Sequence, residues 1–160
     1  MLFRSGYTLG GTGAGNYTLT QPTLAANITA KALTITGLTG TSRTYDGTTT
    51  ASATGSASLV GIVSPDVVTL TGTPAYAFDT RDIGTAKTIT TTGYTLGGTG
   101  AGNYTLTQPT LSANITAKAL TVTGLTASSR IYDGTTSVSV SGSASLSGII
   151  SPDVVTLTGT

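Results

Sequence analysis

Few side chains in this sequence are of the types that perform acid–base, nucleophilic or metal chemistry. The 160 residues include no His and no Cys, all six acidic residues are Asp, and the one Met is Met1. Because His, Cys and Glu carry out much of this chemistry near neutral pH, their absence argues against most enzyme classes. We therefore expect a protein that is not an enzyme and that uses no cofactor.

The carboxylates that could hold a metal ion are Asp66, Asp79 and Asp82. Carboxylate oxygens are ligands that Ca²⁺ accepts, and Asp79 and Asp82 share one short polar segment. Arg81 stands beside Asp82 in that segment, however, and the chain has no Glu to complete a site. These residues are weak calcium candidates, and the favoured interpretation is a polar loop without metal.

Four Asn residues fit the Asn-x-Ser/Thr pattern of a glycan acceptor, namely Asn16, Asn27, Asn103 and Asn114. The pattern arises easily here because the chain contains 38 Thr residues. An Asn at the end of a Gly-rich turn also has an ordinary structural explanation. We treat all four as weak glycan-acceptor candidates.

Nothing in the sequence predicts a site for phosphate groups. The Gly-rich segment Gly10–Gly15, which recurs at 97–102, lacks the Lys-Ser/Thr pair of a P-loop and precedes a predicted strand instead of a helix. We predict a turn or bulge there. The formal net charge is only +1 and no basic cluster is present, so nucleic acid is not an expected partner.

The sequence repeats itself at an offset of 87 residues. The segment Gly6–Leu19 recurs unchanged at Gly93–Leu106, and 57 of 68 positions are identical between Gly6–Thr73 and Gly93–Thr160. The substitutions mostly preserve size and polarity, as expected for copies of one fold. A period of this length is too long for a solenoid coil and suits a β-sandwich domain with its own core.

A change in the alternation pattern indicates where each copy begins. Apolar residues occupy even positions up to Ala32 and odd positions from Leu33, so the buried face changes near Lys31. No Gly or Pro interrupts residues 27–36, which favours a stiff junction. We predict three parts: 1–30, the back portion of a preceding repeat with 1–5 unmatched; 31–117, a complete repeat; and 118–160, the front portion of the following repeat.

Short alternating segments rich in Thr, Val and Ile predict an all-β protein with tandem immunoglobulin-like β-sandwich repeats. We expect strands around 32–37, 48–54, 66–72, 75–79, 86–92, 94–97, 103–107 and 113–117. Turns are expected at Tyr45–Gly47 and Ser64–Asp66, with a hairpin loop at Asp79–Gly84. The expected inward-facing residues are Leu33, Ile35, Val68, Leu70, Tyr76, Phe78, Ile89, Leu96, Tyr104, Leu106 and Ile115, with Thr on the outward face.

One tripeptide stands at the centre of a family resemblance. Tyr45-Asp46-Gly47 recurs as Tyr132-Asp133-Gly134, and Lys-Ala-Leu-Thr, Asp-Val-Val-Thr-Leu-Thr-Gly and Ala-Gly-Asn-Tyr-Thr-Leu recur with it. In the order and spacing of these motifs the chain resembles the YDG domain, a repeat of large haemagglutinin-related, filamentous adhesin exoproteins of bacteria. The resemblance implies an extracellular or cell-surface location and a secreted filamentous protein that takes part in cell adhesion, and the chain itself is threonine-rich. It transfers no catalytic residue, and for Tyr45 we expect a packing role.

The leading hypothesis for function is therefore a structural stalk or spacer of a large adhesin. A second is a repeat that itself binds carbohydrate or a host protein, although few aromatic residues remain for an exposed site. A third is an ice-binding, Thr-rich surface. The expected partners are neighbouring repeats of the same chain, with head-to-tail self-association through the incomplete terminal repeats. No apolar run reaches the ~18 residues of a membrane span, so no membrane insertion is expected.

Overall fold

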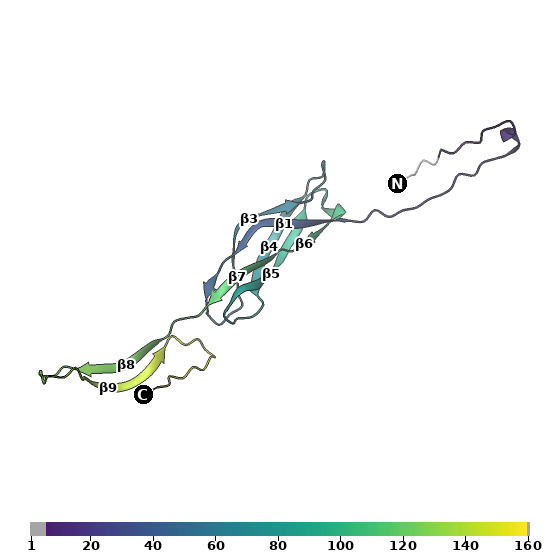
Figure 1. Cartoon of the computed structure of the whole chain (residues 1–160). Coiled ribbons are helices and arrows are strands. Elements are labelled where there is room, and N and C mark those ends of the chain that lie inside the picture. The colour runs from purple at the N-terminus through teal and green to yellow at the C-terminus, as the bar shows by residue number, and fades with distance from the viewer. Residues whose placement is uncertain (1–5, 160) are drawn as a thin grey trace.

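The computed structural model describes residues 6–159, and three parts of the chain follow one another along a single long axis (Figure 1). The N-terminal segment, residues 6–30, runs out and back as an extended loop with one short 3₁₀ helix, η1 (Ala14–Asn16). The central unit comprises residues 31–117. The C-terminal segment, residues 118–159, contains one β-hairpin. The unmatched residues 1–5 lie outside the described part.

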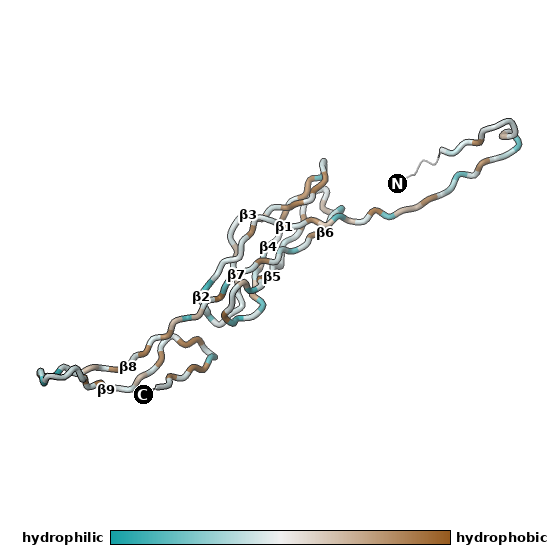
Figure 2. The backbone as a smooth tube through the Cα atoms, viewed as in Figure 1, coloured by the Kyte–Doolittle hydropathy of each residue, from teal (hydrophilic) through white to brown (hydrophobic). Residues whose placement is uncertain are grey.

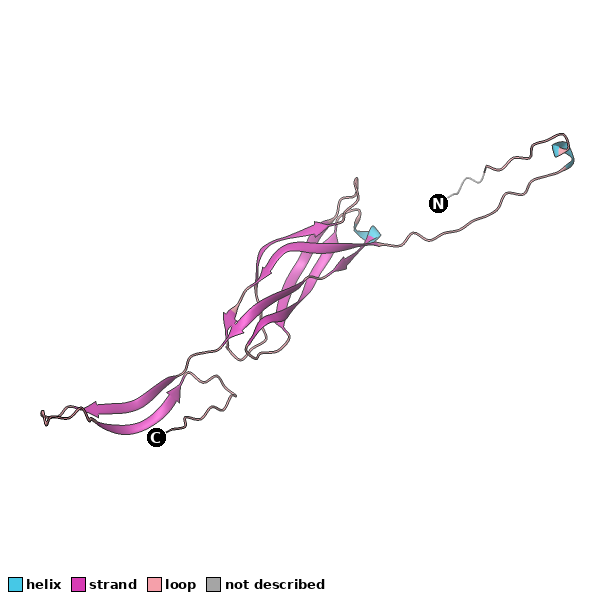
Figure 3. Cartoon of the chain, in the orientation of Figure 1, coloured by secondary structure: helices cyan, strands magenta, loops and turns pink. Residues whose placement is uncertain are grey.

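The described chain is all-β, as predicted, apart from two short 3₁₀ helices (Figure 3). The central unit contains β1 (Lys31–Gly40), β2 (Arg43–Thr44), β3 (Ala53–Val60), β4 (Thr69–Phe78), β5 (Gly84–Gly97), η2 (Ala101–Asn103), β6 (Tyr104–Thr107) and β7 (Thr110–Thr116). One sheet has the order β3-β1-β6 and the other β2-β7-β5-β4. In the C-terminal segment, β8 (Thr121–Ser128) pairs with β9 (Ser139–Ser147). None of the helices in residues 6–159 has the length and apolarity to span a membrane.

Two parallel strand pairs determine where the chain enters and leaves the central unit. The first residue of β1, Lys31, lies opposite Tyr104 at the start of β6. Thr44, at the end of β2, lies opposite Thr116 at the end of β7. The chain therefore enters beside the start of β6, which we call the entry end, and leaves beside β2, which we call the exit end. Figure 1 shows these two ends facing the N- and C-terminal segments.

The core of the central unit consists of two apolar clusters. Phe78, Ile89, Ala113 and Ile115 form the cluster near the exit end. Leu33, Val68 and Tyr104 form the cluster near the entry end. Seven predicted core residues are buried, namely Leu33, Ile35, Val68, Phe78, Ile89, Tyr104 and Ile115. The other four, Leu70, Tyr76, Leu96 and Leu106, are only half-buried.

Two buried residues depart from the predicted pattern. Ala113 belongs to the core but is too small to stand out among the apolar positions of the sequence. Thr91 is 2 % exposed, so the expectation that Thr fills the outward face is wrong at this position. Thr91 lies two positions after Ile89 on β5. Side chains two apart on a strand point to the same face, so Thr91 shares the inward face with Ile89.

The strand prediction at 48–54 is wrong. Residues 48–52 lie outside the named strands, with one isolated bridge between Thr50 and Ala77, and the strand is β3, Ala53–Val60. Small inward-facing residues such as Ala53 and Ala57 make the alternation in this segment hard to detect. The predicted pairs 66–72/75–79 and 86–92/94–97 also prove to be single long strands, β4 and β5. Both strands continue through a shift in their register near Gly72.

The β1–β3 pair carries a similar register shift, at Gly37. Its φ is +86°, and a Cβ there would overlap the carbonyl oxygen of Ser56 on the partner strand, so this position requires glycine. Each residue pair of β1–β3 recurs in β8–β9 with 87 added to both residue numbers. For example, Thr34↔Val60 in β1–β3 corresponds to Thr121↔Ser147 in β8–β9. This hairpin therefore adopts its shape without the neighbouring strands that complete the central unit.

Apolar residues recur along both terminal segments (Figure 2), and many of their side chains are exposed where the central unit covers the equivalent ones. Tyr17 is 74 % exposed and Ile28 is 85 % exposed, whereas Tyr104 and Ile115, at the same positions in the copied sequence, are 8 % and 2 % exposed. The N-terminal segment nevertheless keeps local contacts of the central unit. Gln21 donates to the Tyr7 carbonyl as Gln108 donates to the Tyr94 carbonyl. Missing strand partners, not a different local conformation, account for the exposure.

Candidate functional site

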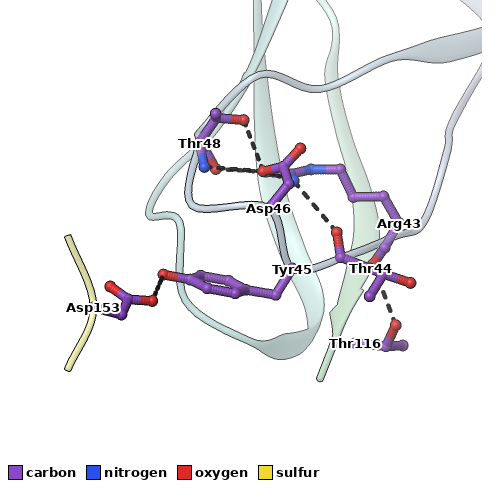
Figure 4. A network of polar contacts seen from close by, with 7 residues as sticks. All are labelled: Arg43, Thr44, Tyr45, Asp46, Thr48, Thr116 and Asp153. Atoms are coloured by element: carbon purple, nitrogen blue, oxygen red, sulfur yellow. Dashed lines mark hydrogen bonds and ion pairs between the residues drawn. The ribbon is translucent and has the colours of Figure 1, made fainter. Parts of the chain in front are cut away.

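The turn Tyr45–Gly47 lies at the exit end of the central unit and is fixed by its own polar contacts (Figure 4). The Asp46 carboxylate accepts hydrogen bonds from the amide and the hydroxyl of Thr48, both at 2.9 Å. The Thr48 amide is the main cause of the lowered pKa of Asp46, since a donor stabilises the charged carboxylate. Gly47 has a φ of +80°, which glycine adopts without strain. Asp46 therefore serves to hold the turn.

Arg43 ties this turn to the core. Its guanidinium forms an ion pair with Asp46 and donates to the Thr48 carbonyl at 2.5 Å. It also lies over the ring of Phe78, 5.4 Å from the ring centre, where the aromatic face attracts a cation. The turn and the exit-end core cluster are thus linked through one side chain.

Tyr45 points away from its own turn and reaches the C-terminal segment (Figure 4). Its hydroxyl donates to the Asp153 carboxylate at 2.5 Å, and its ring packs beside the exit-end core cluster. Arg81 donates to the other carboxylate oxygen of Asp153 at 2.9 Å. The hydrogen bond to Asp153 is the main cause of the raised pKa of Tyr45, because a carboxylate acceptor stabilises the protonated phenol.

Apolar contacts surround this polar pair. A Cβ at Gly47 would lie 2.7 Å from Cγ2 of Ile150, so the turn approaches the C-terminal segment closely. A cavity of about 200 Å³ remains beside it, lined mainly by Ile83, Leu120, Ile149, Ile150 and Val155. This volume is below the roughly 300 Å³ at which small-molecule sites begin. The site therefore has the character of a packed junction between two parts of the chain.

The entry end has a related contact within the central unit. Tyr104 donates its hydroxyl hydrogen to Asp66 at 2.7 Å and accepts the Val63 amide at 3.0 Å. The Val63 amide acts to lower the pKa of Tyr104, but the Asp66 carboxylate and burial together outweigh it and raise this pKa. Asp153 stands 87 positions after Asp66, so equivalent carboxylates accept a Tyr hydroxyl from two different places.

The structure does not bring the three calcium candidates together. Asp66 precedes β4 and Asp79 follows it, and a ten-residue strand spans about 33 Å. Asp79 instead forms an ion pair with Lys87 at 2.9 Å, and Lys87 is the main cause of its lowered pKa. Within residues 6–159 there is no group of three acidic, His or Cys side chains that could hold a metal ion.

The four glycan-acceptor candidates are exposed and occupy two kinds of position. Asn16 and Asn103 end the short helices η1 and η2, where a Gly-rich turn leads into extended chain. Asn114 lies in β7 and accepts the Ala86 amide at 2.8 Å, and Asn27 lies in the extended N-terminal segment. For Asn114 this contact supplies a structural role.

Sequence reasoning did not identify Arg81 and Asp153 as functional residues. They are 72 positions apart, and no local pattern indicates their pairing. The one available signal is the repetition of Ser-Pro-Asp at 64–66 and 151–153. This repetition marks Asp153 as a copy of Asp66 but does not reveal its partners.

A comparison with protein families gives a match. The family model described as YDG domain matches residues 29–111 and again residues 116–160. No curated protein and no solved structure matches the chain. The two matched segments meet at the junction formed by Tyr45, Arg81 and Asp153.

Proposed function

Because the chain belongs to the YDG domain family, we propose that it is a structural stalk or spacer of a large bacterial adhesin that is secreted or displayed on the cell surface. In this proposal the chain is a tandem array of immunoglobulin-like β-sandwich repeats with an 87-residue period. Residues 31–117 are one complete repeat. The array holds an adhesive region away from the cell and performs no catalysis.

The observation that carries this proposal is the position of the entry and exit ends. The chain enters beside Tyr104, at the start of β6, and leaves beside Thr116, at the end of β7, so its entry and exit lie at opposite ends of the central unit (Figure 1). Repeats connected in this way add length along one axis instead of folding back on each other. Such a connection suits a spacer, because each added repeat extends the reach of the array.

Direct contacts at the exit end also support a spacer. Tyr45 and Arg81 both bind Asp153, and Gly47 lies close against Ile150. Several direct contacts between the two parts restrict bending between successive repeats. A restricted junction transmits orientation as well as length.

A repeat that binds carbohydrate or a host protein is the second candidate, and the pattern of exposed aromatic residues gives it less support. Tyr7, Tyr17 and Tyr132 are strongly exposed, at 68 %, 74 % and 90 %. Their copies in the central unit, Tyr94, Tyr104 and Tyr45, are all buried or half-buried. This aromatic surface therefore diminishes in any complete repeat that has a neighbour.

A groove of about 340 Å³ beside β1 is another candidate site for a ligand. It is lined by Thr34, Ile35, Thr36, Leu38 and residues 107–111, none of which carries a charge. Protein sites for sugars usually combine an aromatic platform with several polar groups, and this lining offers no aromatic ring. The groove adds little to the binding hypothesis.

We also propose that the two incomplete ends can complete each other between molecules. In the central unit β1 pairs with β6, beginning at Lys31↔Tyr104, and β2 pairs with β7. The copies of these strands lie in the C-terminal and N-terminal segments, so the end of one molecule offers the strands that the end of another lacks. Only the part equivalent to Pro74–Lys87 would be missing. This contact is head-to-tail and propagates.

Small-angle scattering from chains with two, four and six complete repeats tests the stalk function. The expected result is a rod whose maximum dimension grows linearly with the number of repeats. The outcome that contradicts the proposal is growth with roughly the square root of repeat number, which is typical of freely jointed units.

A further inference from the structure

The Tyr-Asp-Gly turn divides its residues between two tasks. Asp46 is engaged within the turn by Thr48 and by Arg43. Tyr45 and Gly47 instead face the following segment, where they meet Asp153 and Ile150. The middle residue fixes the shape, and the outer two make the contact.

The second copy of the turn shows the same shape without a following segment beside it. Asp133 accepts the amide and hydroxyl of Thr135, both at 2.9 Å, and Gly134 has the same φ of +80°. Tyr132 is 90 % exposed, whereas Tyr45 is half-buried. A Cβ at Gly134 would meet nothing within 4 Å. The turn is therefore preformed, and its contact face is covered only where another segment follows.

The carboxylate that Tyr45 contacts accepts hydrogen bonds from more than one donor. Asp153 receives Arg81 on one carboxylate oxygen and Tyr45 on the other. Asp66, its counterpart, receives Tyr104 of its own unit. An ionised carboxylate offers about four acceptor positions, so one Asp can accept all three donors at once. In an internal repeat the same carboxylate can close its own unit and receive the preceding one.

We propose that the Tyr-Asp-Gly turn is a docking element that recognises the Ser-Pro-Asp loop of the next repeat. The docking face consists of Tyr45, Gly47 and Arg81, and its acceptor consists of Ile150 and Asp153. Tyr132 is equivalent to Tyr45 and therefore docks onto a following repeat. Asp66 is equivalent to Asp153 and therefore accepts the hydrogen bond of the Tyr-Asp-Gly turn of a preceding repeat. The partner is thus a further copy of this domain. This inference rests on the tandem arrangement in the proposed function and assigns the residues that stiffen it.

The two copies of the turn provide a matched experiment in the full 160-residue chain. Tyr45→Phe and Tyr132→Phe each remove one hydroxyl from the same turn, but only Tyr45 has a carboxylate partner in the next segment. NMR relaxation reports whether residues 118–159 tumble with the central unit, and amide hydrogen exchange reports opening at 148–155. We expect Tyr45→Phe to shorten the local correlation time of the C-terminal segment and to speed this exchange several-fold. Tyr132→Phe should change neither.

A second pair separates contact from backbone strain. Gly47→Ala and Gly134→Ala impose a side chain at the same positive φ, but only the first meets Ile150. We expect Gly47→Ala to shift the Ile150 methyl resonances and to loosen the C-terminal segment, and Gly134→Ala to do neither. Unchanged amide shifts across β1–β7 verify that each variant is folded.

Equal effects of the two Tyr substitutions, or of the two Gly substitutions, would overturn the docking proposal. So would a wild-type chain in which the two parts already tumble independently. These outcomes differ from failure of the stalk function, which is measured by scattering from multi-repeat chains. Rod-like scattering together with equal effects of the paired variants would leave the stalk intact and remove the docking element.

Discussion

Tyr104 and Asp66 are joined by a 2.7 Å hydrogen bond that connects the start of β6 to the loop before β4. In the C-terminal segment, the corresponding carboxylate of Asp153 accepts Tyr45 of the central unit at 2.5 Å. The same type of contact therefore closes one unit and joins two units. This type of Tyr–Asp contact bears on the stability of the central unit and on the pH dependence of the junction.

The first prediction concerns the entry-end core. Leu33 is fully buried, whereas its copy Leu120 is only half-buried in the C-terminal segment. We expect Leu33→Ala to lower the free energy of unfolding of the central unit by about 2–5 kcal/mol, because it removes contacts and leaves a cavity. Leu120→Ala should have a much smaller effect. Urea denaturation followed by near-UV circular dichroism measures both, and similar losses in the two variants would contradict this assignment of the core.

The second prediction concerns the register shift between β1 and β3. At Gly37 any side chain requires an unfavourable positive φ and overlaps the Ser56 carbonyl. We expect Gly37→Ala to lower the free energy of unfolding by about 1–3 kcal/mol. Gly102→Ala is the control, because a Cβ there meets nothing within 4 Å and the φ is not positive. A Gly37→Ala variant as stable as the control would show that β1 and β3 pair differently.

The third prediction is that the junction opens in alkaline solution. The pKa of Tyr45 is raised in the folded chain, mainly by its hydrogen bond to Asp153. A raised pKa means that this bond stabilises the junction fully below the ordinary Tyr pKa of about 10, and that the stabilisation is lost as the pH rises through the folded value. Amide chemical shifts of residues 148–153 should therefore change above about pH 10.

Two comparisons check that this alkaline transition belongs to the junction. In Tyr45→Phe the amide shifts of residues 148–153 should already differ from those of the wild type at neutral pH and should show no alkaline transition. Within the central unit, burial and then the Tyr94 hydroxyl raise the pKa of Tyr76 to about 12, so that part should respond later. An unchanged alkaline transition in Tyr45→Phe would assign it to another group.

The fourth prediction concerns association through the incomplete ends. The full chain should form end-to-end oligomers whose size grows with concentration, and a chain of residues 31–117 should remain monomeric. Ile28→Asp should abolish association, because Ile28 is 85 % exposed while its copy Ile115 is buried in the complete unit. Val154→Asp is the control, since Val154 and its copy Val67 are both exposed. Sedimentation velocity at matched concentrations measures the association of each chain. A strictly monomeric wild-type chain would refute association through the incomplete ends.

Several features follow from local sequence alone. The alternation of apolar residues places Leu33, Ile35, Ile89 and Ile115 inside, because side chains two apart on a strand share one face. The Asp46–Gly47 turn is likewise local, as its copy at Asp133–Gly134 keeps the same φ and the same Thr contacts without a neighbour. The β8–β9 hairpin keeps the register of β1–β3 for the same reason.

Other features depend on residues that are far apart in the chain and were decided only by the tertiary structure. The parallel pairing of β1 with β6 joins residues about 73 positions apart, and no local pattern specifies which strands become neighbours. Pairing with β1 makes the segment of small residues at 53–60 a strand. Pairing between β4 and β5 makes each of them one continuous strand. The contact of Tyr45 and Arg81 with Asp153 depends on where one unit ends and the next begins. Sequence periodicity reports which face of a strand is buried, whereas strand neighbours and junction contacts are set by packing over the whole unit.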